Sequence, residues 1–462
     1  MEGYKRFLEK KAINYGSSGF KVLSEDLNNK LFDWQRELVR WALYKGRSAL
    51  FEDCGLGKTA QQLEWGKHIS SHTGGDVLIL APLAVSLQTK REGVKFGIEV
   101  NVCRSQDDVI GGINITNYEN LDNFDPAHFT GIVLDESSIL KNFTGKYCNK
   151  IIESFINTPY KLACTATPSP NDYTELGTTA EFLGVMTRPE MLSMFFINDA
   201  GDTGTWRLKG HVKDNLFWEW LSSWAVMIRK PSDIGYDDNG FVLPPLIIHE
   251  HVVPFNGCRE TLFVEPARTL SDRRKARSEC LDERVSIASN MANQSEEKWV
   301  MWCNMNAESS ALKASINGAV EVTGSDNQGY KEASLLSFSK GEIKVLVTKP
   351  RIAGFGMNFQ NCSNMAFVGL SDSYEQFYQA VRRCWRFGQP NPVHAHIITG
   401  EREGNVVDNI KRKEADAAAM FDGMVSHMAT FVKKELSGFK QNKTDYTPKI
   451  EMKLPAFMEE SQ

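Results

Sequence analysis

The strongest chemical signal in the sequence is a short glycine-containing run that could bind a phosphate group. Its residues are Gly55, Leu56, Gly57, Lys58 and Thr59. An apolar segment precedes the run and a helix-like segment follows it, which is the context of a phosphate-binding loop. In such a loop backbone N–H groups point at phosphate oxygens, the lysine reaches the β- and γ-phosphates, and the threonine ligates Mg²⁺. The alternative is an ordinary glycine-rich turn, because Glu52 stands where the general pattern has glycine.

Two adjacent acids form the second candidate site. Asp135 and Glu136 directly follow the apolar run 131–134, which is typical of a buried strand. A carboxylate beside a phosphate-binding loop can hold Mg²⁺, and a neighbouring acid can accept a proton from the attacking water. We therefore predict that Asp135 binds Mg²⁺ together with Thr59 and that Glu136 is the general base. Alternatively, the two acids only begin a surface turn.

A pair of arginines could complete a phosphate site from the C-terminal half of the chain. Arg383 and Arg386 are three residues apart, so on a helix both guanidinium groups lie on one face. A planar, permanently charged group can offset charge on a transferring phosphoryl group, an effect of ~10³–10⁵ in rate. This role requires the two halves of the chain to close on each other. A solvated basic helix face is the alternative, although Trp385 and Phe387 interleave with the arginines.

Two series of short apolar runs supply the strands that must position these residues. In the N-terminal half the runs are 48–51, 77–81, 113–116, 132–134 and 161–165. In the C-terminal half they are 299–303, 345–348, 366–370 and 394–398. Helix-like segments separate the runs, a pattern typical of parallel sheets in α/β proteins. The fold class that we predict is therefore α/β, with two tandem parallel-sheet lobes facing each other.

The chain divides into four parts on this basis. We predict an N-terminal lobe at 1–185, an insertion and linker at 186–297, a C-terminal lobe at 298–400, and a helix with a polar tail at 401–462. The insertion is expected to be mostly helical, because apolar residues recur in it at helical spacing.

Composition limits the classes of protein to which the chain can belong. Its 462 residues are 42% hydrophobic and 24% charged, which is ordinary for a globular protein and too apolar for a disordered one. The longest apolar stretches are too short to span a bilayer, and the N-terminus lacks the apolar core of a signal peptide. Nine cysteines without a CxxC pair argue against a zinc ribbon and a secreted disulfide scaffold. We therefore expect a cytoplasmic protein without a membrane partner.

Net charge and the distribution of basic residues bear on nucleic-acid binding. A formal charge of −5 excludes a globally basic nucleic-acid coat, so any DNA contact must use a local cleft. The basic clusters are Arg273, Arg274, Lys275 and Arg277, and separately Arg229 and Lys230. Either cluster could instead be a solvated helix face. A group of tryptophans could stack bases but is more typical of a core: Trp218, Trp220 and Trp224.

The histidines do not predict a metal centre. The candidates are His68, His72, His249, His251, His394 and His396. The first two lack the glutamate of an HExxH motif, and the last four alternate along strands without a cysteine partner. Mg²⁺ is therefore the metal that the sequence predicts.

Together these residues resemble the motifs of a known family. Residues 55–59, 135–138 and 165–168 are similar in type and order to motifs I, II and III of the superfamily 2 helicases and translocases. Residues 379–389, QAVRRCWRFGQ, resemble motif VI of the Snf-type branch, the double-stranded DNA translocases that include chromatin remodellers. Looser matches are the Q-motif at 33–36, motif Ia at 80–83, motif Ib at 117–119 and motif V at 348–358. The compact size and the segment 216–236 are similar to translocases carried by bacteriophages and prophages.

Four positions depart from the family pattern. Ser137 and Ser138 replace a pair that is often Ala-His, which leaves open how hydrolysis is coupled to the neighbouring lobe. Arg382 stands where Snf-type members commonly have an acid, and Trp385 stands where many have histidine.

The resemblance implies the fold, the cofactors and several site residues. It implies two RecA-type lobes, with a mostly helical insertion between them and a C-terminal helical extension. ATP and Mg²⁺ are the implied cofactors, Lys58 and the arginine pair act in catalysis, and Gln35 reads adenine. Gly356 and Gln389 are implied as further nucleotide-binding residues.

The activity implied is hydrolysis of ATP to ADP and phosphate, stimulated by DNA, which drives stepping along a duplex. The expected contacts are to the phosphate backbone and are independent of sequence, with RNA as an alternative partner. A strand-separating DNA or RNA helicase is the first alternative function, and an ATP-gated nucleic-acid-binding scaffold without motor activity is the second. The implied location is the bacterial cytoplasm, or the host-cell cytoplasm for a phage-encoded protein.

Overall fold

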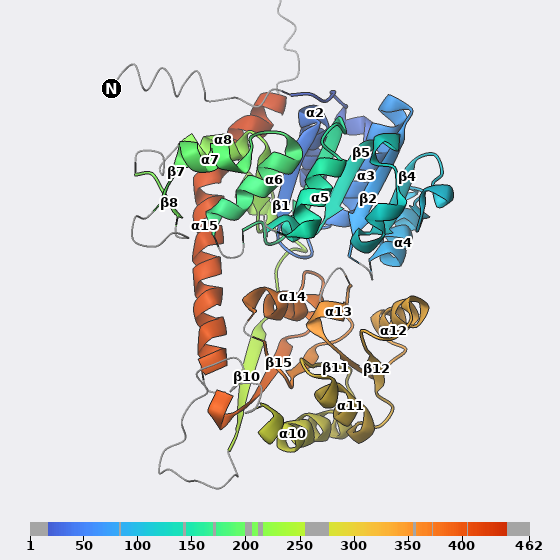
Figure 1. Ribbon diagram of the computed structural model, residues 1–462, viewed down its shortest axis with the longest axis vertical. Helices are drawn as coiled ribbons and strands as arrows, with labels where there is room; N and C mark the ends of the chain where they lie inside the picture. The colour runs from blue at the N-terminus through green and yellow to red at the C-terminus, as the bar shows by residue number, and fades with distance from the viewer. Residues whose placement is uncertain are drawn as a thin grey trace, which may run out of the picture.

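The two series of apolar runs form two parallel β-sheets, one in each half of the chain (Figure 1). The computed structural model describes residues 17–82, 85–141, 145–169, 172–198, 206–210, 216–254, 277–353, 357–371, 373–403 and 405–440. Most strand residues are buried whichever face they point to, because helices pack on the sheets. The predicted fold class, α/β with two tandem parallel-sheet lobes, is confirmed.

The first lobe contains a seven-stranded sheet in which neighbouring strands are parallel. Its strands are β1 (Arg47–Glu52), β2 (Asp76–Ala81), β3 (Asn101–Val102), β4 (Ile113–Asn117), β5 (Phe129–Asp135), β6 (Tyr160–Thr165) and β9 (Ala225–Ile228). Their order across the sheet is β3-β4-β2-β5-β6-β1-β9. Strands β5, β6 and β1 are therefore neighbours, and their C-terminal ends lie at one edge of the sheet.

Seven α-helices accompany this sheet among the described residues. They are α2 (Asp33–Lys45), α3 (Lys58–Thr73), α4 (Ser86–Phe96), α5 (Lys146–Ser154), α6 (Leu176–Leu183), α7 (Arg188–Phe195) and α8 (Leu216–Ser222). Three short 3-10 helices are used below: η3 (Tyr118–Asn123), η5 (Ser137–Lys141) and η7 (Pro231–Ile234). A small antiparallel hairpin, β7 (Phe196–Asn198) with β8 (Trp206–Leu208), follows α7.

The second lobe contains a six-stranded parallel sheet. Its strands are β10 (Leu246–Val253), β11 (Trp299–Trp302), β12 (Val320–Val322), β13 (Val345–Thr348), β14 (Asn364–Phe367) and β15 (Val393–Gly400). Their order is β10-β15-β14-β11-β13-β12. The helices of this lobe are α10 (Leu281–Gln294), α11 (Asn306–Ser315), α12 (Gln328–Lys340), α13 (Pro350–Ala353) and α14 (Tyr374–Cys384).

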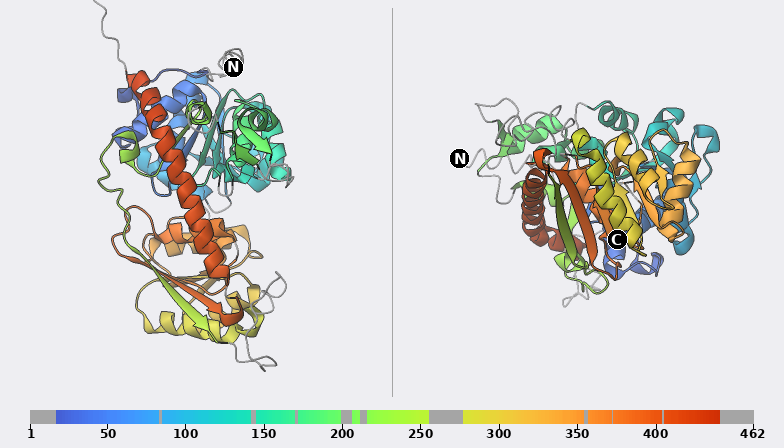
Figure 2. Two further views of the ribbon diagram at one scale, coloured as in Figure 1. Left: turned by 90° about the vertical axis from the view of Figure 1, so that its left-hand side faces the viewer. Right: turned by 90° about the horizontal axis from the view of Figure 1, so that it is seen from below.

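A long C-terminal helix, α15 (Asn405–Lys440), connects the two lobes. It begins beside the second lobe and runs along the side of the molecule to the first lobe (Figures 1 and 2). Its buried residues Met424, Met428, Val432 and Leu436 belong to the core of the first lobe. Although α15 has 36 residues, neither it nor any other described helix is both long and apolar enough to cross a membrane.

Every strand predicted from an apolar run is present, although the one expected at 366–370 lies earlier, at Asn364–Phe367. Six strands were not predicted: β3, β12, and the four that come from residues 186–297, which are β7, β8, β9 and β10. β9 extends the first sheet beside β1, and β10 extends the second sheet beside β15. The tryptophan group is buried in the first-lobe core, which confirms the core interpretation: Trp218, Trp220 and Trp224.

Candidate functional site between the two lobes

The loop between β1 and α3 is shaped by two glycines. Gly55 and Gly57 have φ angles of 90° and 83°, in the left-handed region that favours glycine. A Cβ atom at Gly57 would lie 2.5 Å from Gln35 Nε2, so a side chain here would displace the Gln35 amide. The same Gln35 atom donates a 2.8 Å hydrogen bond to the carbonyl of Leu56. Because α3 begins at Lys58, its first N–H groups face the loop and suit an anion.

Lys58 and Thr59 occupy the first turn of α3. Lys58 Nζ donates hydrogen bonds to the backbone carbonyls of Glu52, at 2.8 Å, and Asp53, at 3.1 Å. Glu52 is fully buried, and burial raises its pKa to about 7, against the opposing effects of Lys58 and a hydrogen bond from Gln61. A buried acid was not predicted here. The only signal in the sequence was that Glu52 replaces a glycine of the general loop pattern.

Asp135 lies at the end of β5, on the sheet edge that also carries the loop after β1. Gln62 Nε2 of α3 donates a 2.8 Å hydrogen bond to Asp135 Oδ1. Burial, and then the charge of Glu136, raises the pKa of Asp135 to about 6. Within the described chain Oδ2 of Asp135 accepts no hydrogen bond, so this oxygen is available to a cation. An aspartate oxygen and the hydroxyl of Thr59 are ligands that suit Mg²⁺.

Glu136 has a strained backbone that turns its side chain toward the end of β6. Its φ of 60° lies in the left-handed region, and it is the one described non-glycine residue with a positive φ. Thr165 Oγ1 donates a 3.2 Å hydrogen bond to Glu136 Oε2, and the N–H of Thr167 donates to Thr165 Oγ1 at 3.1 Å. The candidate base is thereby connected by hydrogen bonds to the segment 165–168.

The C-terminal turn of α14 lies against the loop after β1, so the two lobes meet at this site. A Cβ atom at Gly55 would lie 3.0 Å from Phe387 Cδ2, which shows how closely the second lobe approaches. Arg383 is buried, and its guanidinium donates to the carbonyls of Gln379, at 3.0 Å, and Met357, at 3.1 Å. The guanidinium of Arg383 is therefore fixed relative to its own lobe.

Arg383 and Arg386 lie in a region with excess positive charge. Burial, and then the charge of Arg383, lowers the pKa of Arg386 to about 10. Arg383 also lies within electrostatic range of the first lobe, because its charge opposes the rise in the pKa of Asp135. Among the described residues neither arginine has an ion-pair partner. Two uncompensated guanidinium groups in this position favour an anionic ligand.

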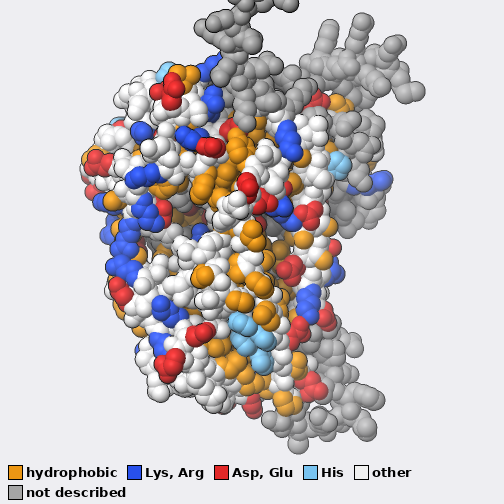
Figure 3. Space-filling model, turned by 180° about the vertical axis from the view of Figure 1, so that it is seen from behind, with side chains coloured by type: hydrophobic (Ala, Val, Ile, Leu, Met, Phe, Trp, Pro, Cys, Tyr) orange, Lys and Arg blue, Asp and Glu red, His pale blue; other side chains and the backbone are white. Residues whose placement is uncertain are grey.

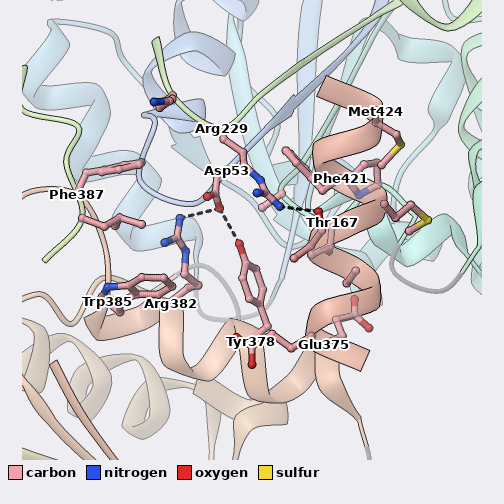
Figure 4. Close-up of a pocket in the computed structure, with 18 of the residues that line it drawn as sticks. Asp53, Thr167, Arg229, Glu375, Tyr378, Arg382, Trp385, Phe387, Phe421 and Met424 are labelled. Atoms are coloured by element: carbon pink, nitrogen blue, oxygen red, sulfur yellow. Dashed lines mark hydrogen bonds and ion pairs between the residues drawn. The ribbon is translucent and has the colours of Figure 1, made fainter. Parts of the chain in front are cut away.

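Arg382, which the sequence did not select, makes the direct contact with the loop. Its Nη2 lies 2.6 Å from Asp53 Oδ1 and 3.0 Å from the carbonyl of Cys54. The Tyr378 hydroxyl donates a 2.7 Å hydrogen bond to the same Asp53 oxygen (Figure 4). Charge was the signal in the sequence that could have revealed the contact. Arg382 stands in α14 where the family pattern has an acid, and its partner Asp53 is an acid.

Gln35 and Gln389 were predicted to bind nucleotide, and their amide groups are engaged within the protein. Gln35 Oε1 accepts from the N–H of Phe32 at 3.0 Å while its Nε2 supports the loop. Gln389 Nε2 donates to the carbonyls of Gln360, at 2.8 Å, and Cys362, at 3.1 Å. Gln35 thus contacts the loop itself, whereas Gln389 forms hydrogen bonds that stabilise a turn inside the second lobe.

Several residues singled out in the sequence lie outside the described residues. They are Leu83, Gly354, Gly356, Arg273, Arg274 and Lys275. The described member of that basic cluster, Arg277, is buried and pairs with Glu403 at 2.7 Å. Arg277 therefore stabilises the second lobe and is not a surface contact for nucleic acid.

Two cavities flank the contact between α14 and the first lobe. The first has a volume of about 480 Å³ and lies between the ends of β1 and β6, α14 and α15 (Figure 4). The second has a volume of about 410 Å³, and Lys141, Lys331 and Arg351 line it together with Glu136. Lys141 of η5 forms an ion pair with Glu375 of α14 at this second cavity. The second cavity therefore joins the candidate base to basic residues of both lobes.

Four histidines come together on the neighbouring strands β10 and β15, which the sequence did not predict. His249 and His394 are 3.0 Å apart between ring nitrogens, and so are His251 and His396. Figure 3 shows imidazoles grouped among hydrophobic side chains on the back of the second lobe. In the part of the chain that the structure describes, no group of three or more histidine, cysteine or acidic residues suits a metal ion.

Comparison with known proteins agrees with the two-lobed fold. Residues 31–195 match the SNF2-related domain, and residues 278–388 match the helicase conserved C-terminal domain. Among curated proteins no significant match was found. The two domains, in this order, indicate an SNF2-type helicase of superfamily 2, which is a class of ATP-dependent helicase-like motors.

Proposed function

We propose that the protein hydrolyses ATP to ADP and phosphate and uses the free energy to move along duplex DNA. The observation that carries the proposal is the position of Arg383 and Arg386. They come from the second lobe, lie near the phosphate loop and Asp135 of the first lobe, and have no ion-pair partner among the described residues. A triphosphate provides the negative charge that this region lacks.

The two lobes contribute different roles to the proposed reaction. In the first lobe the N–H groups of the loop and Lys58 bind the phosphates, while Thr59 and Asp135 hold Mg²⁺, which offsets phosphate charge when bound. Glu136 accepts a proton from the water that attacks the γ-phosphate. From the second lobe the arginine pair offsets the charge that develops on the transferring group. Hydrolysis therefore requires the lobes to be together.

A chain of hydrogen bonds supports coupling between hydrolysis and lobe movement. Glu136 is bonded to Thr165, and Thr165 to the N–H of Thr167. Thr167 lines the cavity that also contacts α14 and α15, the helices that connect the first lobe to the second. A change in the charge or contacts of Glu136 on hydrolysis would thus be transmitted to the interface between the two lobes.

The second cavity supports the proposed place of the nucleic acid. Pro82, Tyr118 and Glu119, which lie in the segments similar to motifs Ia and Ib, line one wall. Lys331 and Arg351 of the second lobe line the other. Basic side chains from both lobes, with Lys141 on the first, and no base-reading element identified in the sequence favour contacts to the phosphate backbone.

Phosphate release measured with different nucleic acids tests the proposal. Rates are compared without nucleic acid and with single-stranded DNA, duplex DNA or RNA, at two salt concentrations. We expect the largest stimulation by duplex DNA, with an apparent affinity that falls as salt rises. A rate unchanged by every nucleic acid would instead indicate an ATP-gated scaffold.

Displacement assays separate movement along a duplex from strand separation. A third strand bound to a duplex is displaced by a protein that tracks along the duplex, whereas a strand-displacement substrate reports unwinding. We expect ATP-dependent displacement of the third strand without unwinding. Unwinding without displacement of the third strand would favour a strand-separating helicase.

A further inference from the structure

Arg382 crosses from the second lobe to the phosphate loop of the first lobe. Its side chain is 1% exposed, and its guanidinium contacts the Asp53 carboxylate at 2.6 Å and the Cys54 carbonyl at 3.0 Å. Both partners precede Gly55 directly in the sequence. The contact therefore joins α14 to the segment that leads into the phosphate loop.

Asp53 presents its charge at a fixed position. Its backbone N–H donates to the carbonyl of Ile228 in β9 at 3.0 Å, which ties it to the first-lobe sheet. Its Oδ1 accepts from the N–H of Cys54 at 2.6 Å and from the Tyr378 hydroxyl at 2.7 Å, in addition to Arg382 (Figure 4). Two side chains of α14 thus converge on one carboxylate oxygen of the other lobe.

Aromatic rings surround the Arg382 guanidinium and restrict its position. The centroids of Tyr378, Trp385 and Phe387 lie 5.7, 4.9 and 5.8 Å from its central carbon. Such distances allow cation–π attraction to the rings. Phe387 itself packs on Gly55 of the loop and lies 5.7 Å from Phe241, so the ring set also spans both lobes.

The position of α14 decides where the arginine pair points. Arg383 cannot reach toward the first lobe independently, because its guanidinium is bonded to carbonyls of its own lobe. Arg386 lies two residues after the end of α14, in the turn that follows the helix, so it does not share a helix face with Arg383 as the sequence predicted. The two guanidinium groups therefore approach the loop only when the end of α14 approaches it.

We propose that Arg382 is a positioning residue that fastens the end of α14 to Asp53, so that Arg383 and Arg386 face the γ-phosphate. The Nη2 group of Arg382 is held by a carboxylate and a carbonyl of the first lobe, and this contact assigns Arg382 to holding α14 in place. The inference rests on the proposed ATPase function and adds a residue to it. It also gives a role to the position where this chain has arginine and the family pattern has an acid.

The first test is a mutant cycle on ATP hydrolysis. The variants Arg382→Gln, Asp53→Asn and the double variant are compared with the wild type under duplex-DNA stimulation. Because small misplacement of catalytic groups can cost ~10²-fold, we expect each single change to lower kcat by about 100-fold with KM changed by less than about 3-fold. The double variant is expected to be no slower than the slower single variant, since the pair acts as a unit.

The second test asks whether the loss comes from the arginine pair. Arg386→Ala is measured in the wild type and in the Arg382→Gln background. We expect a loss of ~10³-fold or more in the wild type, and a further loss of less than about 10-fold once Arg382 is gone. A purely structural role of Arg382 would leave the cost of Arg386→Ala unchanged.

Two further variants act as controls for folding and charge. Arg382→Lys keeps the charge but not the planar fork, and we expect a kcat about 10-fold above that of Arg382→Gln. Arg412→Gln removes an exposed arginine that pairs with Asp416 on α15, and its kcat should equal that of the wild type.

The outcomes distinguish this inference from the proposed function. A wild type that hydrolyses ATP, together with Arg382→Gln at the wild-type kcat, would overturn the inference alone. The inference would also be overturned if the decreases in kcat of Arg382→Gln and Asp53→Asn multiplied in the double variant. A wild type without ATPase activity under any condition would overturn the proposed function, and the inference with it.

Discussion

Thr165 Oγ1 donates a 3.2 Å hydrogen bond to Glu136 Oε2, and this bond joins the ends of the adjacent strands β5 and β6. Glu136 adopts a positive φ of 60°, so the fold maintains a strained residue at this point. Strain of this kind concentrates where a side chain must be directed at a reacting group. The geometry accords with a base that is positioned in advance and connected to the interface between the lobes.

Replacing Glu136 by glutamine should stop hydrolysis while leaving nucleotide binding intact. Glutamine keeps the size and can still bond Thr165, but it cannot accept the proton of the attacking water. Loss of a general base costs ~10²–10⁴ in rate, so we expect kcat to fall by that factor. ATP affinity, measured by titration, should change by less than about 3-fold. The control is Glu153→Gln on the exposed face of α5, and equal rates for both variants would exclude Glu136 as the base.

Glu52 should make the stability of the first lobe depend on pH. The folded protein holds the proton of Glu52 up to a pKa of about 7, whereas an unfolded glutamate loses it near 4.5. Its contribution to the free energy of unfolding is therefore complete below about pH 4.5 and is lost as pH rises through 7. At about 1.4 kcal/mol per pKa unit the loss is on the order of 3 kcal/mol.

Glu52→Gln should remove this part of the pH dependence. From pH 5 to pH 8 the free energy of unfolding should fall more in the wild type than in the variant. Denaturant titration at both pH values measures this difference. Glu153→Gln, an exposed change, should run parallel to the wild type. If the free energy of unfolding changed equally from pH 5 to pH 8 in Glu52→Gln and in the wild type, Glu52 would be ionised in the folded protein at both pH values.

Helix α15 should be part of the first-lobe core although it begins beside the second lobe. Met428 is 0% exposed and belongs to the same core cluster as the sheet of the first lobe. We expect Met428→Ala to lower the free energy of unfolding by about 2–5 kcal/mol. Thr430→Ala, on the exposed face of the same helix, should change it by less than about 0.5 kcal/mol. Equal stability of the two variants would mean that α15 does not pack on the first lobe.

The basic residues of the second cavity should contribute to DNA affinity through charge alone. Lys331→Gln and Arg351→Gln should each weaken binding by a similar factor on unrelated duplex sequences. Each should also reduce by about 1 the slope of log affinity against log salt, because one phosphate contact is lost. Fluorescence anisotropy over a salt series measures both quantities. Lys433→Gln, exposed on α15, serves as the control, and an effect confined to one sequence would contradict backbone recognition.

Most strands of the two large sheets could be predicted because they are buried on both faces. Segments such as 77–81 and 345–348 therefore appear as uninterrupted apolar runs. β10 was not predicted because it lies at the edge of its sheet and three consecutive polar residues, His249, Glu250 and His251, interrupt its apolar residues. β9 was not predicted because only two residues separate it from the tryptophan-rich helix α8 and its four residues continue the apolar character of that helix.

The candidate site was predictable where one residue type at one spacing implies one chemistry. The glycines of the loop and the two acids at the end of β5 are of this kind, although their roles in catalysis remain predictions. The contact between Arg382 and Asp53 joins residues 329 positions apart, and only the fold shows that they meet. The burial of Glu52 likewise depends on strands on either side of β1, which its own sequence neighbours do not indicate.

Single-turnover hydrolysis by Arg386→Ala beside the wild type, with bound ATP measured separately, tests most directly whether the two lobes share the hydrolytic site. In the proposed site the second lobe supplies this guanidinium. We therefore expect a chemical step slower by ~10³–10⁵, with ATP affinity changed by only a few-fold. A single-turnover rate equal to that of the wild type would contradict a site shared between the two lobes.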